Sequence, residues 1–201
     1  MIGATVLVLG ATFVLAACGL GDDDSAATDP TDVAETAPAD TVPFEPPVSL
    51  SECPTTDVAG DLDLNGSCTI DSNVIVSGSV AIKGGALLVL GTIDGSVNQS
   101  GSGGVAVGLQ GLVMGDINEA NAGAVRLEGG TATGSVTESG QGAVILETGS
   151  TVEGSVAEGG RGNVRIRAGA RVGADITESG RGDCQISEEA EFGGPAADGC
   201  A

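Results

Sequence analysis

Aliphatic residues recur in a fixed register through the second half of the chain, with a repeat of about 20 residues. Each repeat holds a triplet of the type Gly-Ser/Asp-Val/Ile and, further along, a pair of apolar residues spaced two apart. A spacing of two places apolar side chains on one face of a β-strand. A short repeat of such strands predicts an all-β fold, a parallel β-solenoid whose coils contact only their neighbours. The triplets are Gly95-Ser96-Val97, Gly115-Asp116-Ile117, Gly134-Ser135-Val136, Gly154-Ser155-Val156 and Ala174-Asp175-Ile176.

The alternation within one coil predicts which side chains face the interior. Gly154 and Val156 should point inward, with Gly154 leaving room at a narrow place, and Glu158 should follow on the outside. The glycine-rich turn at 159–162 should need positive φ. Asn121, which replaces a glycine of this turn in another coil, is the kind of residue that tolerates that geometry.

Glutamates occupy one position of successive coils, and Gln99 occupies the same position one coil earlier. If this column faces outward, its carboxylates lie ~4.8 Å apart and present oxygen ligands of the kind that Ca²⁺ prefers. The other interpretation, which we favour, is a solvated corner partly neutralised by Arg161 and Arg181, with no metal and no cofactor. The four glutamates are Glu119, Glu138, Glu158 and Glu178.

The repeated strands resemble those of the bactofilins, bacterial polymer-forming proteins. The resemblance covers about residues 62–194, and it implies a right-handed triangular β-helix. It extends to the fold and not to the cytoskeletal role, because bactofilins are not typically secreted and polymerise through open ends. The matching segments run from Val76 to Val80, from Ile93 to Val97, from Val113 to Ile117 and from Val152 to Val156.

Composition and charge exclude several classes of function. The formal net charge is −21, and the single lysine is Lys83. This charge argues against nucleic-acid binding and against electrostatic binding to an anionic membrane. The chain contains no His, Trp or Tyr, so a Cys/His or Ser/His/Asp nucleophile system cannot be built. We therefore expect a protein without enzymatic activity.

The N-terminal segment predicts export. Residues 2–17 carry no charge and end in Leu15-Ala16-Ala17-Cys18, which resembles the lipobox of bacterial lipoproteins. The resemblance implies that residues 1–17 are a signal peptide and that Cys18 is acylated. A transmembrane helix is the alternative, but the segment is short for one, and the usual basic residues before the apolar run are missing. Residues 18–47, rich in Asp, Ala, Thr and Pro, predict a disordered tether.

Four cysteines remain once Cys18 is acylated, and an exported protein favours two disulfides. Six or so coils separate Cys68 from Cys184 by about 25–30 Å, too far for a disulfide. The expected pairs are therefore Cys53–Cys68 and Cys184–Cys200; the absence of His and of CxxC spacing disfavours a metal site. Cys68 should take the Val position of a triplet, and Cys184 that of Val164, both inward.

These pairs would hold flanking segments over the ends of the solenoid. The expected organisation is an N-terminal cap and first irregular coil over 48–73, repeats over 74–194 and a C-terminal cap over 195–201.

The leading functional hypothesis is a non-enzymatic surface protein of the cell envelope, bound to the membrane through its lipid. We expect it to be monomeric and to serve a structural or interaction role, with a glycan or protein of the envelope as its partner. The first alternative is a ligand-binding solenoid that takes a glycan or Ca²⁺ along an outer face. The second alternative is an exported bactofilin-like polymer.

Overall fold

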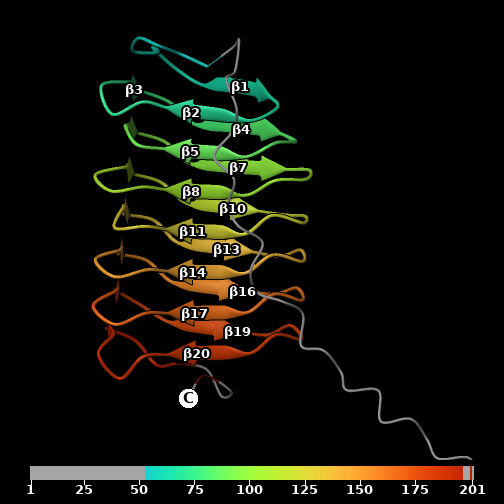
Figure 1. Ribbon diagram of the computed structural model, residues 1–201, viewed down its shortest axis with the longest axis vertical. Helices are drawn as coiled ribbons and strands as arrows, with labels where there is room; N and C mark the ends of the chain where they lie inside the picture. Colours follow the sequence, from blue (N-terminus) through green and yellow to red (C-terminus); the bar gives the residue numbers. More distant parts are fainter. Residues whose placement is uncertain (1–52, 197–199, 201) are drawn as a thin grey trace, which may run out of the picture. The chain divides into compact units, whose positions relative to one another are not determined.

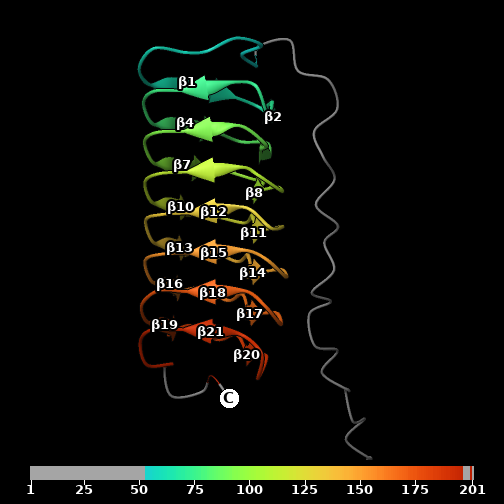
Figure 2. The same cartoon turned by 90° about the vertical axis from the view of Figure 1, so that its left-hand side faces the viewer.

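The structure, a computed structural model, describes residues 53–196 and Cys200. This part of the chain winds as a right-handed parallel β-solenoid (Figures 1 and 2), which confirms the predicted fold class. Every coil contributes a short strand to each of three parallel sheets, and each sheet has seven strands. In the described residues no helix is long and apolar enough to cross a membrane. The predicted signal peptide, acylated Cys18 and tether lie outside the described residues.

Sheet 1 carries the Val or Ile of each triplet at the start of its strands. Its order follows the coils, so every strand pairs with its equivalents in the coils before and after. The strands are β1 (Leu62–Asn65), β4 (Val80–Lys83), β7 (Val97–Ser100), β10 (Ile117–Glu119), β13 (Val136–Glu138), β16 (Val156–Glu158) and β19 (Ile176–Glu178).

Sheets 2 and 3 follow sheet 1 in every coil. Sheet 2 comprises β2 (Cys68–Ile70), β5 (Leu87–Val89), β8 (Val105–Val107), β11 (Val125–Leu127), β14 (Val144–Leu146), β17 (Val164–Ile166) and β20 (Cys184–Ile186). Sheet 3 comprises β3 (Ile75–Val76), β6 (Thr92–Ile93), β9 (Leu112–Val113), β12 (Thr131–Ala132), β15 (Thr151–Val152), β18 (Arg171–Val172) and β21 (Glu191–Phe192).

Columns of aliphatic side chains fill the interior between the three sheets. Val156 is fully buried and stacks in register between Val136 and Ile176, as the alternation predicted. Thr137, the next residue after Val136, is only half-buried on the outer side of the same sheet. Because the strands are short, the interior between the three sheets is narrow, and stacked Val, Ile and Leu side chains fill it without aromatic residues.

The triplets owe their composition to contacts between coils. The Ser or Asp side chain accepts a hydrogen bond from the backbone of the next coil: the N–H of Ser135 donates to Asp116 Oδ1 at 2.8 Å, and that of Ser155 to Ser135 Oγ at 3.2 Å. The preceding glycine is half-buried at the corner, and a Cβ on Gly154 would lie 2.7 Å from the carbonyl carbon of Gly134. The prediction that Gly154 points into the core was therefore wrong, because the tight approach is to the neighbouring coil.

The two other corners use glycine for different reasons. Positive φ occurs in the turn before sheet 3, at Gly129, Gly149 and Gly169 (φ 80°, 80° and 73°). In the turn between sheets 1 and 2 it occurs in an early coil, at Gly101 and Gly103 (φ 124° and 125°), as predicted for this type of turn. The turn at 159–162 was predicted to need positive φ, but its glycines do not adopt it, and neither does Asn121. Glycine is required there by space, because a Cβ on Gly162 would overlap the carbonyl oxygen of Gly142 in the coil before.

Both ends of the solenoid carry a disulfide-bonded flank. Cys53 bonds Cys68 and Cys184 bonds Cys200, the pairing that the length of the rod predicted. Cys68 and Cys184 lie in the first and last strands of sheet 2, and both are buried. The N-terminal flank adds one parallel bridge, Val58 to Val76, and the C-terminal flank adds two, Ala196 to Ile176 and Cys200 to Cys184. Each flank thus extends the pairing beyond the last full coil.

One register prediction was wrong. Cys68 pairs with Leu87 in sheet 2 and does not take the Val position of a triplet. The residue in that position is Leu62, which pairs with Val80 in sheet 1. Gly66-Ser67-Cys68 therefore resembles a triplet only in composition, and the true first member is Gly60-Asp61-Leu62. With this register the first coil is close in length to the second, and the apparent irregularity disappears.

Candidate functional site

The glutamate column lies inside the solenoid, at the corner where sheet 1 turns into sheet 2. Glu119, Glu138 and Glu158 are 1%, 0% and 0% exposed, and Glu178 is half-buried at the C-terminal end of the column. The prediction of an outward, solvated column was wrong. Glu158 follows Val156 by two residues on one strand, so both must point to the same side. Counting the alternation from Val156 would have found this, whereas reasoning from charge alone did not.

Backbone amides of the following turn hold each buried carboxyl group. Oε1 of Glu138 accepts hydrogen bonds from the N–H groups of Gly140 and Gly142, at 2.7 and 3.2 Å. Glu158 repeats this geometry with Gly160 and Gly162 at the same distances. The turn thus folds back over the carboxyl group, and its glycines let two N–H groups converge on one oxygen. Charge-assisted bonds of this kind offset part of the cost of burial.

The two ends of the column differ in their partners. Glu119 accepts from the N–H of Asn121 with both carboxyl oxygens, each at 3.1 Å, and from that of Gly123 with Oε1. Glu178 accepts from the N–H of Gly180 at 2.7 Å. Gln99 occupies the next position of the column and donates its amide to the carbonyl of Gly85 at 3.2 Å. The column therefore begins with a neutral amide and ends in a half-buried acid.

The second carboxyl oxygens of three of these acids lack a hydrogen-bond donor. Oε2 of Glu138, Glu158 and Glu178 is buried and receives no hydrogen bond from a donor. Burial, together with the contacts that its carboxyl group makes with Glu119 and Glu158, raises the pKa of Glu138 to about 9, although the amides of Gly140 and Gly142 act in the opposite direction. Burial and the neighbouring Glu158 likewise raise the pKa of Glu178 to about 7.

This arrangement does not form a metal centre. Among the described residues, no group of three or more His, Cys, Asp or Glu side chains is placed to hold a metal ion. The carboxyl groups lie in a line, one per coil, so they do not converge on a point, and Ca²⁺ requires six to eight oxygen ligands. The Ca²⁺ alternative considered for this column therefore lacks the geometry that it needs.

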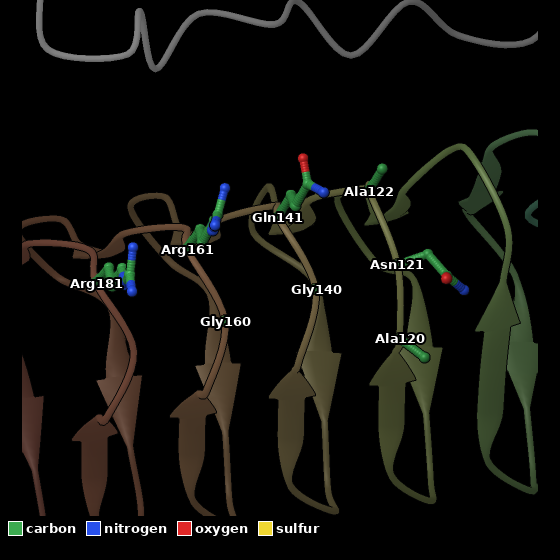
Figure 3. Close-up of a pocket in the computed structure, with 8 residues that line it drawn as sticks. All are labelled: Ala120, Asn121, Ala122, Gly140, Gln141, Gly160, Arg161 and Arg181. Atoms are coloured by element: carbon green, nitrogen blue, oxygen red, sulfur yellow. The ribbon is translucent and has the colours of Figure 1, made fainter.

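On the outer side of the same corner, two arginines border a shallow depression of about 690 Å³. Gln141, Arg161 and Arg181 stand on successive coils and point away from the ribbon on one side (Figure 3). Both arginines are exposed, and neither forms an ion pair with another residue in the described part of the chain. Asn121 and the glycines of the turns complete the lining.

Other arginines of the described region have partners. Arg126 contacts Glu128 at 2.8 Å and Glu147 at 2.9 Å. Arg167 lies 3.9 Å from Glu147, and Arg171 lies 3.2 Å from Glu191. Arg167 with Glu147 and Arg171 with Glu191 are pairs between neighbouring coils. Exposed pairs of this kind contribute ~0–1 kcal/mol each. Arg161 and Arg181 differ from these arginines in having no ion pair within the described residues.

No protein-family model, curated protein or solved structure gave a significant match to this chain.

Proposed function

We propose that this protein is a non-enzymatic, lipid-anchored surface protein of the bacterial cell envelope, in which a rigid solenoid serves a structural or interaction role. The observation that carries the proposal is the pair of disulfides at the two ends of the rod. Disulfides form and persist in oxidising compartments outside the cytosol. This location agrees with Leu15-Ala16-Ala17-Cys18, the lipobox-like end of the apolar N-terminal segment.

The lipid anchor has a direct test. The full chain is expressed in a bacterial host, and its mature N-terminus is analysed by mass spectrometry and by partitioning into a detergent phase. We expect residues 1–17 to be absent, Cys18 to carry acyl chains and the protein to enter the detergent phase. Cys18→Ala is the matched control and should remain in the aqueous phase. Mature protein that retains residues 1–17, or that carries an unmodified Cys18, would refute the anchor.

The absence of activity is argued from where the acidic groups lie. Three of the four carboxyl groups that the fold gathers together, Glu119, Glu138 and Glu158, are enclosed by the turns that donate hydrogen bonds to them, and the fourth, Glu178, is half-buried at the end of the column. A substrate cannot reach a general acid in the enclosed positions. The depression on the outer side of the corner is lined by amides, small residues and two arginines, and it holds no acid–base pair.

A second candidate function is favoured by that depression. Arg161 and Arg181 repeat at the coil spacing of ~4.8 Å and have no counter-charge in the described region. Guanidinium groups bind carboxylate, sulfate and phosphate groups through paired hydrogen bonds, and Gln141 adds an amide beside them. We propose an acidic glycan as the ligand, because it presents such groups at regular intervals to a regular column of donors.

Binding of soluble acidic polysaccharides tests this second function. Polygalacturonate and heparin serve as probes in calorimetric titrations at low ionic strength, since binding to two exposed cations weakens as salt is added. Binding should disappear in the Arg161→Ala/Arg181→Ala double variant. It should persist in Arg171→Ala, which removes an exposed arginine that already has Glu191 as partner. Equal binding by both variants would show that general charge, and not the corner, holds the glycan.

A further inference from the structure

We propose that the column of Glu119, Glu138, Glu158 and Glu178 is a proton-binding site, which holds two shared protons in a chain of carboxyl groups and so ties four successive coils together. The column runs through the interior on strands β10, β13, β16 and β19. The four acids occupy one position of successive coils: Glu119 pairs in register with Glu138, Glu138 with Glu158 and Glu158 with Glu178, so each carboxyl group has another as its neighbour along the column. A carboxyl–carboxyl contact is a hydrogen bond only if a proton lies in it.

The unpartnered oxygens locate the protons. Oε1 of each acid is engaged by turn amides, whereas Oε2 of Glu138, Glu158 and Glu178 is buried without a donor. Oε2 of Glu158 is directed toward the next coil, since a Cβ on Gly180 would lie 3.0 Å from it. An ionised oxygen left in this state loses its hydration with no compensation. A proton on every second acid supplies the missing donor.

Repulsion sets the number of protons. Carboxylates in adjacent coils are ~4.8 Å apart along the column, and two ionised groups at that separation in a dry interior repel each other strongly. In a row of four acids, at least two must be protonated if no two adjacent acids are to be ionised together. Both oxygens of Glu119 already accept hydrogen bonds from backbone N–H groups, those of Asn121 and Gly123. The buried oxygens that lack a donor therefore place the two protons on Glu138 and Glu178, on either side of Glu158.

A metal cation is a poorer ligand for the same oxygens. The acids lie in a line, so each gap between coils offers oxygens from only two side chains, and no three acidic groups of the described region converge on a point. A proton requires only two oxygens. Gln99, which stands next in the column, shows that a neutral group with a donor suits this place, because its amide N–H₂ makes a hydrogen bond to Gly85.

No other ionisable group in the described interior competes for these protons. In the four coils that begin with β10, β13, β16 and β19, the buried side chains of sheets 2 and 3 are aliphatic, apart from the disulfide-bonded Cys184. Along sheet 1 itself the inward neighbours are Ile117, Val136, Val156 and Ile176. The nearest cations, Arg161 and Arg181, stand on the outer side of the turns and are exposed. The column therefore titrates as a unit.

The sign of the pH dependence follows from the raised values. The pKa of Glu178 is raised to about 7 and that of Glu138 to about 9 in the folded protein, while both are near 4.3 in an unfolded chain. The folded state therefore binds more protons than the unfolded state between these limits. The stabilisation is fully present below about pH 4 and falls as pH rises; the contribution of Glu178 is lost by about pH 7 and that of Glu138 by about pH 9.

Carbon-13 NMR of the full-length protein, labelled at the Glu carboxyl carbon, observes the protons directly. At about pH 6, where ordinary glutamates are ionised, two resonances should keep the shift of a neutral acid. Glu138→Gln and Glu178→Gln should each remove one of them. A spectrum with every glutamate ionised at this pH overturns the proposal even if the variants fail to fold.

Urea unfolding between pH 6 and 10 measures the consequence. The wild-type midpoint should fall as pH rises. Glu138→Gln, which replaces the shared O–H by an amide N–H, should lose most of the fall between about pH 7 and pH 9, where Glu138 alone still holds an extra proton in the folded state. Glu153→Gln, an exposed position on the same coil as Glu158, should follow the wild type. The same fall in Glu138→Gln as in the wild type contradicts the proposal, and so does a wild-type midpoint that depends on added Na⁺, K⁺ or Ca²⁺, because the ligand would then be a metal cation.

Discussion

Placing a carboxylate at Val156 should be far more damaging than placing one at Thr137, although the two side chains lie on adjacent strands of sheet 1. Val156 is fully buried between Val136 and Ile176. Thr137 is the half-buried outer neighbour of Val136 and pairs with Asn118 and Ala157. Val156→Asp therefore puts a charge into the core, whereas Thr137→Asp puts one into water.

The cost at Val156 can be worked from three contributions. Holding the introduced acid neutral at pH 7 costs about 4 kcal/mol, which is 1.36 kcal/mol for each of the ~3 units above an ordinary Asp pKa. A buried polar group without a partner adds about 1–3 kcal/mol, and lost burial of the valine adds about 1.5–2 kcal/mol. The sum, about 6–9 kcal/mol, is comparable with the whole stability of a domain. For Thr137→Asp we expect a change within about 0.5–1 kcal/mol.

Glu158, on the same strand, shows why these numbers apply to Val156 and not to every inward position. Its carboxyl group is equally buried, but the amides of Gly160 and Gly162 donate to it at 2.7 and 3.2 Å. Val156 lies mid-sheet, where the backbone N–H groups are engaged between coils; its own donates to the carbonyl of Asp175 at 2.9 Å. An acid at Val156 would find no free donor.

Far-UV circular dichroism during urea unfolding, at pH 7 and at pH 4, is the assay. Val156→Asp should lose most or all of its folded signal at pH 7 and recover part of it at pH 4, where neutralising the acid costs little. Thr137→Asp should match the wild type within the expected range at both values. Equal midpoints for the two variants at pH 7 would refute the assigned inward register and, with it, the list of core residues.

Three further predictions concern the turns and the ends of the solenoid. Gly162→Ala should lower the melting temperature in thermal scans, because its Cβ would overlap the carbonyl oxygen of Gly142. Gly159→Ala is the control and should leave the melting temperature unchanged, because its Cβ would lie 3.8 Å from its nearest neighbour. Equal losses in the two variants would contradict this account of the turn. Replacing both Cys184 and Cys200 by Ser should cost about 2–4 kcal/mol in urea unfolding, and no loss would mean that the C-terminal flank contributes nothing to stability. Finally, the protein without its lipid (Cys18→Ala, residues 1–17 removed) should be monomeric in light scattering and form no filaments in electron microscopy, because both sheet ends are covered and the net charge of −21 adds repulsion. Filaments one solenoid wide under oxidising conditions would instead support the bactofilin-like polymer, while filaments that appear only after reduction would support the role of the flanks.

The sequence by itself determined the β-solenoid, because period and alternation are properties of the chain that need no partner. The spacing of the triplets predicted the register that stacks Val136, Val156 and Ile176. The length of the array predicted which cysteines could meet, since Cys68 and Cys184 lie at opposite ends of sheet 2. Both inferences rest on the fixed rise of stacked strands.

Only the tertiary structure decided what the corners do. The alternation from Val156 points Glu158 inward, but its charge favoured solvent, because an isolated carboxylate is costly to bury. Burial becomes possible when the turn at 160–162 brings two N–H groups to one oxygen and when neighbouring coils supply further acids. The same holds for the glycines of that turn, whose need for space arises from the coil before and not from their own φ. The sequence of a single repeat does not show its contacts with neighbouring coils. Those contacts are what allow a column of carboxyl groups to form part of the core.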